Sequence, residues 1–205
     1  MRLHGPALFI GLLMLSYWAS VIAMVIKTKK RVGKAANFLP PEPLGRVLRV
    51  LWYPLVGIWI IHPITMGFVR RTDRLAWPVR PLMLTHYFAA IPMIIAAVAF
   101  LYTLVCWRKM GKSWRMGIDP NETTELIVEG PYAYVRHPIY TLSIVLMLCT
   151  MLIVPTPLML IAGVLHITFL VWEARREEQY LVQVHGDPYA RYLQQVGRFI
   201  PRPRA

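Results

Sequence analysis

The fold is decided by one stretch of sequence, GPYAYVRHPIY at residues 130–140, a basic and aromatic loop that leads directly into an apolar segment. A second polar cluster, EARREEQYL, follows at residues 173–181. Between them, from Thr141 to Trp172, the chain has no Lys, Arg, Asp or Glu. We therefore expect two short membrane helices that fold back on each other and bring both clusters to one side of the membrane. A site at that boundary could serve a soluble reagent and a lipid-like one together.

The composition supports a membrane protein. Of 205 residues, 57% are hydrophobic and only 16% are charged, whereas soluble domains usually carry about 25% charged residues. Three more apolar runs cover roughly residues 6–26, 50–69 and 82–107. A span needs about 20 apolar residues, and each arm of the hairpin (138–154 and 157–172) is shorter than that. The sequence predicts an all-α integral membrane protein with about five transmembrane helices and a C-terminal helical hairpin.

The first apolar run has two interpretations. Arg2 precedes it, as in a signal peptide, but the run is long for one and the basic cluster KTKKR at residues 27–31 ends it. We expect an uncleaved helix.

Basic residues set the expected orientation. With five spans and an outside N-terminus, most Lys and Arg fall on the inner side, which agrees with the positive-inside rule. Arg70, Arg71, Arg74 and Arg80 are the local exception. The formal net charge of +13 lies beside helix ends, which favours anionic lipid headgroups as partners over nucleic acid. The polar clusters of the hairpin are then expected on the cytosolic face.

Isolated residues within the apolar runs carry weaker signals. Cys106 and Cys149 are expected to be small buried hydrophobes, because their spacing fits neither a metal site nor a disulfide framework. His62 and His166 could mark a substrate path, but such residues more often hydrogen-bond a neighbouring helix.

The chain after the hairpin predicts one further short helix. The second arm should continue past Trp172 and stop near Gly186, followed by Asp187 as an N-cap and Pro188 as the first helical residue. Tyr189, Tyr192, Leu193 and Val196 then share one stripe, and Gly197 ends the helix. A helix of this length cannot span, so it should lie at the interface or fold over the hairpin.

The polar residues at this end allow two interpretations. They could be snorkelling arginines, interfacial tyrosines and surface ion pairs, or they could form a polar pocket covered by the last helix. The sequence shows no Gly-rich phosphate loop, nucleophile elbow or metal-ligand spacing, which argues against nucleotide hydrolysis, serine hydrolysis and metal catalysis.

The combined motifs favour the pocket. The string GPYxYVRHPIY, then EExxL, then GxxYxxY and VxRxxP resembles the isoprenylcysteine carboxyl methyltransferase family, a group of integral-membrane methyltransferases that also includes phospholipid N-methyltransferases. The resemblance covers roughly residues 112–203. The matching positions are residues 130–140, Glu177, Glu178, Leu181, Gly186, Tyr189, Tyr192, Val196, Arg198 and Pro201. The apolar runs before residue 107 carry no matching motif.

The resemblance implies that S-adenosylmethionine binds on the cytosolic side, between the hairpin and the C-terminal helices. The residues that would line or brace its pocket are Arg136, His137, Tyr140, Glu177, Glu178, Tyr189, Tyr192 and Arg198. Arg136 suits the cofactor's carboxylate, Glu177 or Glu178 its ammonium or ribose hydroxyls, and the tyrosine faces its sulfonium.

The acceptor is expected to be lipophilic or lipid-like. If it is a carboxylate, Arg175 or Arg176 could hold it, and these two with Glu178 are the candidate catalytic residues. Two departures from the family pattern are His185, where Phe is frequent, and Glu173, where an arginine is common. The second leaves the acceptor class open.

We therefore expect an S-adenosylmethionine-dependent membrane methyltransferase, with N-terminal helices in residues 1–107 and a catalytic region in residues 108–205. Carboxyl methylation of a prenylated cysteine and methylation of a phospholipid amine are both open. A membrane lipid reductase and a non-enzymatic membrane subunit are the alternatives from other classes.

Overall fold

The computed structural model describes residues 4–33, 39–69, 71–82, 88–111, 114 and 126–202. Within these ranges the protein is helical, and its only β-type pairing is an isolated bridge between Val135 and Gly197. The main helices are α1 (His4–Val32), α2 (Pro43–Phe68), α3 (Ala90–Met110), α4 (Pro138–Ile153), α5 (Pro157–His185) and α6 (Asp187–Gln195). Short 3-10 helices cover Thr72–Arg74 (η1), Trp77–Val79 (η2) and Gly130–Ala133 (η4).

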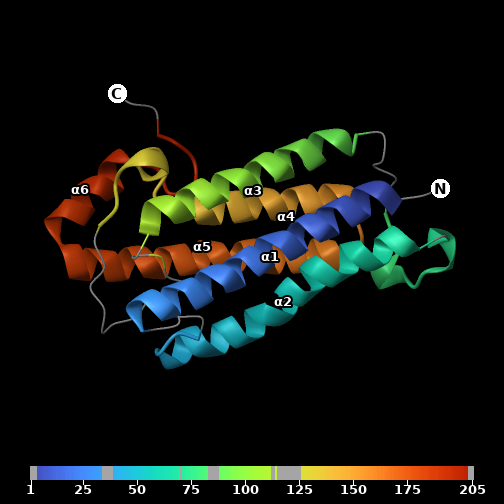
Figure 1. Ribbon diagram of the computed structural model, residues 1–205, viewed down its shortest axis with the longest axis horizontal. Coiled ribbons are helices and arrows are strands. Elements are labelled where there is room, and N and C mark those ends of the chain that lie inside the picture. Colours follow the sequence, from blue (N-terminus) through green and yellow to red (C-terminus); the bar gives the residue numbers. More distant parts are fainter. Residues whose placement is uncertain are drawn as a thin grey trace.

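Helices α1 to α5 run along the long axis of the molecule, and α6 lies at one end of them (Figure 1). Four of these helices, α1, α2, α3 and α5, are long and apolar enough to cross a membrane. Helix α4 is apolar but has only 16 residues, about 24 Å of helix against a hydrocarbon core of about 30 Å. The prediction of an all-helical membrane protein is confirmed; a fifth complete span remains a prediction.

The hairpin of α4 and α5 forms as the sequence predicts. Thr156 caps α5 by accepting a hydrogen bond from the Met159 amide at 3.2 Å, and α4 packs against both α3 and α5. Helix α5 continues beyond Trp172 to His185 and ends at Gly186, whose φ of 59° suits glycine. The start of α4 and the end of α5 consequently lie together.

The histidines within the spans join helices. His166 on α5 accepts a hydrogen bond from the Trp52 indole at 3.0 Å and bonds the Ser143 hydroxyl at 3.1 Å. His62 on α2 lies 2.7 Å from the Thr156 hydroxyl. Both contacts confirm the expectation that these residues bond neighbouring helices, and they fix α2 against the hairpin.

The C-terminal helix confirms the two tyrosines of the predicted stripe, whereas Leu193 and Val196 are only half-buried and Val196 follows the helix as its C-cap. The boundaries of the helix also differ from the prediction. Tyr189 and Tyr192 are buried, whereas Arg191 and Gln195 are exposed. The N-cap is Gly186 and not Asp187, because the positive-φ glycine makes the turn and Asp187 already lies in the helix. The helix also ends at Gln195, before the predicted Gly197.

The end of the bundle that carries α6 is rich in cations. Lys29, Lys30 and Arg31 lie in the last turn of α1, and Arg108 and Lys109 in the last turn of α3. Arg71, Arg74 and Arg80 follow α2 at the opposite end, while Arg70 and Arg2 lie outside the described residues. Cys106 and Cys149 are buried free thiols, as expected.

Candidate functional site

The C-terminal segment is held against the arginine–histidine motif by backbone contacts. The Arg136 amide donates to the Gly197 carbonyl at 2.8 Å, and the His137 amide donates to the Arg198 carbonyl at 3.1 Å. A Cβ on Gly197 would lie 1.9 Å from the Ile200 carbonyl oxygen, so this close approach requires glycine. Gly197 and Arg198 therefore form part of the same structure as the loop before α4.

Glu178 is the centre of a buried charged network. Its carboxylate accepts hydrogen bonds from Arg136 Nε at 2.9 Å and from Arg198 Nε at 3.0 Å, and His137 Nε2 lies 3.2 Å away. Arg198 Nη2 donates to the second oxygen at 2.5 Å. The Arg136 and Glu178 side chains are only 6% and 7% exposed. Because three side chains already donate to Glu178, this glutamate is suited to holding the surrounding segments in place and less suited to binding a ligand.

Arg136 extends the same network to α6. Its Nη1 donates to the Leu193 carbonyl at 3.1 Å and also to the Val196 carbonyl. One guanidinium therefore joins the loop before α4, α5 and the end of α6. The hydrogen bond to Glu178 also raises the pKa of Arg198, against the opposing effect of its partial burial.

Glu177 points elsewhere. Neighbouring residues on an α-helix are about 100° apart around the axis, so Glu178 faces the network while Glu177 lines a cavity. Its side chain is 34% exposed, and its carboxylate lies 3.6 Å from His137 Nδ1. The His137 ring stacks on Tyr140 with centroids 5.3 Å apart. Glu177 is the carboxylate that faces the cavity.

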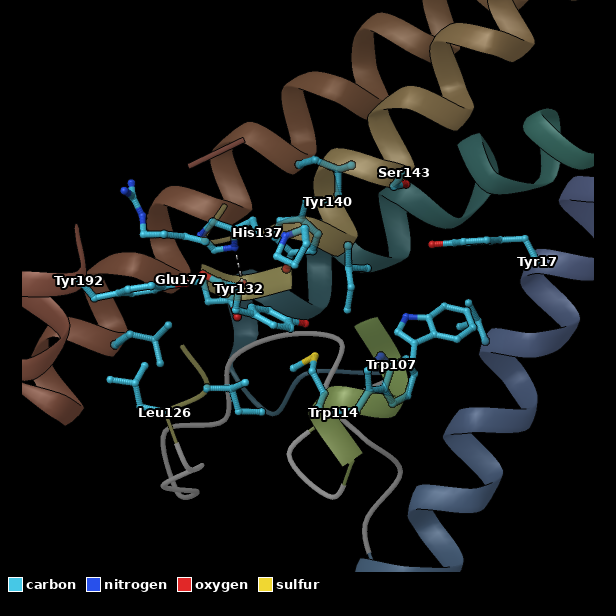
Figure 2. A pocket seen from close by; sticks show the side chains of 18 of the residues that line it. Tyr17, Trp107, Trp114, Leu126, Tyr132, His137, Tyr140, Ser143, Glu177 and Tyr192 are labelled. Atoms are coloured by element: carbon cyan, nitrogen blue, oxygen red, sulfur yellow. Dashed lines mark hydrogen bonds and ion pairs between the residues drawn. The ribbon is translucent and has the colours of Figure 1, made fainter. Parts of the chain in front are cut away.

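The cavity has a volume of about 160 Å³ and takes lining residues from all six helices. Figure 2 shows Glu177, His137 and Tyr192 toward one side of it and Tyr17 and Trp107 toward the other. The lining residues contributed by the N-terminal helices and Trp114 are Tyr17, Trp18, Val21, Arg49, Trp52, Trp107, Met110 and Trp114.

These N-terminal lining residues were not found from the sequence. Tyr17, Trp52 and Trp107 lie in apolar runs where aromatic side chains equally fit a helix–helix core, and several of them also pack in that core. These side chains face one another only because of the way helices α1 to α3 pack together. No local sequence pattern indicates that packing.

Helix α6 covers the polar part of the cavity. Tyr189 and Tyr192 line it, and the Tyr192 hydroxyl donates to the Tyr132 carbonyl at 2.5 Å. Burial raises the pKa of Tyr192 to about 12, although Arg136 opposes the shift. The phenol therefore keeps its proton, and this hydrogen bond, at physiological pH.

A second ion-pair network lies on α5 four residues before Glu177. Glu173 is buried, with Arg176 Nη1 at 2.9 Å and Arg49 Nη2 at 3.7 Å. Arg176 also pairs with Glu42 and lies 4.6 Å from the centre of the Trp172 ring. Of these residues, only Arg49 lines the cavity.

The structure divides the sequence-predicted site residues into three groups. The six that line the cavity are Arg136, His137, Tyr140, Glu177, Tyr189 and Tyr192. Glu178 and Arg198 brace it from behind. Arg175 is exposed and Arg176 belongs to the Glu173 network, so neither lines the cavity. Within the described ranges, no group of three or more His, Cys, Asp or Glu could hold a metal ion.

Comparison with known families identifies the group to which this geometry belongs. A family model described as phospholipid methyltransferase matches residues 85–188, a range that includes α3, the α4–α5 hairpin and both polar clusters. A search of the curated proteins finds no match. The matched range covers half of the chain and the whole hairpin, so the chain belongs to the phospholipid methyltransferase family, within the group of integral-membrane methyltransferases that its motifs resemble.

Proposed function

We propose that this protein transfers a methyl group from S-adenosylmethionine to a lipophilic acceptor that enters from the bilayer, as in the isoprenylcysteine carboxyl methyltransferase-like enzymes. One observation carries the proposal. A single cavity joins a polar end, with Glu177 and His137, to an aromatic end built from the helices α1 to α3. A soluble, charged cofactor and an apolar acceptor could meet in such a cavity.

The residues present fit the chemistry of the cofactor. S-adenosylmethionine supplies an electrophilic methyl group on a sulfonium, and also carries a carboxylate, an ammonium and ribose hydroxyls. Glu177 would accept hydrogen bonds from the ammonium or the hydroxyls. The first turn of α4, with the Ile139 and Tyr140 amides and the positive end of the helix dipole, would suit the cofactor's carboxylate. The faces of Tyr140 and Tyr189 would attract the sulfonium, a contact worth about 0.5–2 kcal/mol.

The role of Arg136 is narrower than the sequence suggests. All three of its guanidinium nitrogens already hydrogen-bond or pair with Glu178, Leu193 or Val196. These contacts support Arg136 and Arg198 as residues that fix the pocket's shape, with Glu178 as their shared acceptor. Methyl transfer depends on alignment of donor and acceptor more than on proton transfer, so a rigid wall would serve the reaction directly.

Closure by α6 would exclude water from the reacting atoms. Tyr192 ties this helix to Tyr132 in η4, which also lines the cavity. An open pocket would hydrate the acceptor and lose its alignment. In this proposal residues 108–205 form the cofactor region, the helices in residues 1–107 shape the acceptor's side, and the site faces the cytosol, where the excess of cations is expected.

Two acceptor classes each have support. The family match favours a phospholipid amine, whereas the motif string favours the carboxyl group of a prenylated cysteine. A lipid reductase would instead require NADPH, and a non-enzymatic subunit would require neither cofactor.

Titration calorimetry of the purified full-length protein in detergent tests the proposal. We expect S-adenosylhomocysteine to bind and NADPH not to bind, and we expect labelled methyl groups from S-adenosylmethionine to enter either phosphatidylethanolamine or a prenylcysteine. Glu177→Gln should weaken S-adenosylhomocysteine binding about tenfold or more. Arg175→Gln, which alters an exposed cation outside the lining, is the matched control. Absence of S-adenosylhomocysteine binding by the wild type would overturn the proposal.

A further inference from the structure

We propose that Arg49 binds an anionic group of the acceptor, and that the acceptor is therefore an amphiphile with a phosphate or carboxylate at or near the atom that receives the methyl group. The inference rests on the proposed function and names the chemistry of its acceptor. Arg49 lies on α2, outside the range that the family model matches.

The position of Arg49 is unusual for a cation. It is 5% exposed and lies in a helix long and apolar enough to cross a membrane. Ionisable residues in such segments are costly and commonly serve a substrate path. Arg49 is also the one charged residue among the described lining residues of α1, α2 and α3. On that side of the cavity the other side chains are aromatic or apolar, so they suit an acyl or prenyl chain.

The guanidinium is held in a fixed place. It lies 5.2 Å from the centre of the Trp52 ring and 5.7 Å from that of Phe169, and Glu173 Oε1 lies 3.7 Å from its Nη2. A planar guanidinium presents donors in a fork that matches carboxylate and phosphate oxygens. A site held by packing in this way loses little entropy when an anion binds.

The location relative to Glu177 also fits. Glu173, the partner of Arg49, lies four residues before Glu177 on α5, so the two carboxylates are about one helical turn, roughly 6 Å, apart along the axis. An acceptor anion at Arg49 would then lie one turn deeper in the bundle than a cofactor held at Glu177. A sulfonium and a guanidinium in one cavity repel each other, and an anion between them reduces that repulsion.

The first measurement is acceptor binding without cofactor. Calorimetry of the full-length protein in detergent would use four probes: short-chain phosphatidylethanolamine, a prenylcysteine, a long-chain amine without an anion, and free phosphoethanolamine. We expect one of the two anionic amphiphiles to bind, and Arg49→Gln to weaken it about ten- to a hundredfold. Arg49→Lys should restore part of the affinity. The amphiphile that responds identifies phosphate or carboxylate as the recognised group, and binding of phosphoethanolamine alone would assign the site to a free anion and overturn the proposal.

Controls separate recognition from folding. Arg46→Gln removes an exposed cation one turn earlier on the same helix and should change no affinity. In Arg49→Gln the buried Glu173 loses one of its two arginine partners and keeps Arg176. The double variant Arg49→Gln/Glu173→Gln removes both charges of the pair, and it should still discriminate less between the anionic amphiphile and the amine. S-adenosylhomocysteine affinity should stay within about threefold in each variant.

The outcomes distinguish this inference from the proposed function. Arg49 would be only structural if Arg49→Gln lowered the affinities for the anionic amphiphile and for the amine equally. A parallel loss of S-adenosylhomocysteine affinity would show the same. A wild type that binds the anionic amphiphile through Arg49 but binds no S-adenosylhomocysteine would overturn methyl transfer and leave the anion site standing. In turnover assays we expect Arg49→Gln to raise KM for the acceptor with a smaller change in kcat.

Discussion

Replacing Glu178 by glutamine should release the C-terminal segment from the bundle while the transmembrane helices stay folded. Glu178 is the shared acceptor for the side chains of Arg136, His137 and Arg198. The backbone amides of Arg136 and His137 in turn hold Gly197 and Arg198 beside the Val135–Gly197 bridge. Glutamine keeps the size of the side chain and one oxygen, but it loses the charge that balances the two arginines.

The magnitude follows from the burial of each partner. Arg136 and Glu178 are 6% and 7% exposed, and breaking a buried pair by removing one charge costs about 3–5 kcal/mol. The Arg198 side chain is 31% exposed, so screening limits its contribution to about 1 kcal/mol or less. Since glutamine retains an acceptor, we take the lower end of this range of free energies, about 3 kcal/mol. That value corresponds to roughly a hundredfold change in the equilibrium for opening of the C-terminal segment.

Hydrogen exchange read by mass spectrometry would measure this opening in detergent. The Arg136 and His137 amides donate to Gly197 and Arg198, so their protection should fall about a hundredfold in Glu178→Gln. Protection within α1 to α3 should not change. Binding of S-adenosylhomocysteine should weaken as well if the variant lowers the population of the closed pocket, because affinity falls with the fraction of protein that is competent to bind.

Glu177→Gln is the matched control on the neighbouring residue. Its side chain is 34% exposed and contacts His137 at 3.6 Å, so we expect protection within about threefold of the wild type but a clear loss of cofactor affinity. If the two variants lose protection equally, or if Glu178→Gln keeps it, the separation into a bracing and a cavity-facing carboxylate is wrong.

Two further predictions concern α6 and the C-terminal segment. Tyr192→Phe loses the hydrogen bond to the Tyr132 carbonyl, a cost of about 1 kcal/mol, so calorimetry should show S-adenosylhomocysteine binding about fivefold weaker, whereas the exposed Gln195→Ala should be silent. The loss should be constant between about pH 6 and pH 9, because a phenol with a pKa of about 12 stays protonated there; a loss that varies over this range would contradict the assignment. Gly197→Ala would place a Cβ 1.9 Å from a carbonyl oxygen, and it should lower the melting midpoint and cofactor affinity, whereas Gly57→Ala has nothing within 4 Å of its Cβ and should not destabilise the protein. Equal melting midpoints for the two alanine variants would show that the C-terminal segment repacks without cost.

The sequence alone determined the elements and their order. Charge-free apolar runs need a lipid or protein environment, so the helices and the hairpin follow from composition. The start of α4 follows from Pro138, which has no N–H, and the end of α5 follows from Gly186, which has a positive φ. Both are local properties of the chain. The buried stripe of Tyr189 and Tyr192 follows from helical periodicity in the same way.

The site depended on tertiary structure. Adjacent glutamates look alike in the sequence, and only the packing of α5 against the loop and the C-terminal segment directs Glu178 to three donors and Glu177 to the cavity. The sequence likewise offered Arg175 and Arg176 for the acceptor, but α5 turns one outward and pairs the other with Glu173. Arg49, from a helix more than a hundred residues earlier, lines the cavity instead. Local patterns fix which residues form a helix and which face is apolar, but the neighbour that each face meets is fixed only when the helices pack together.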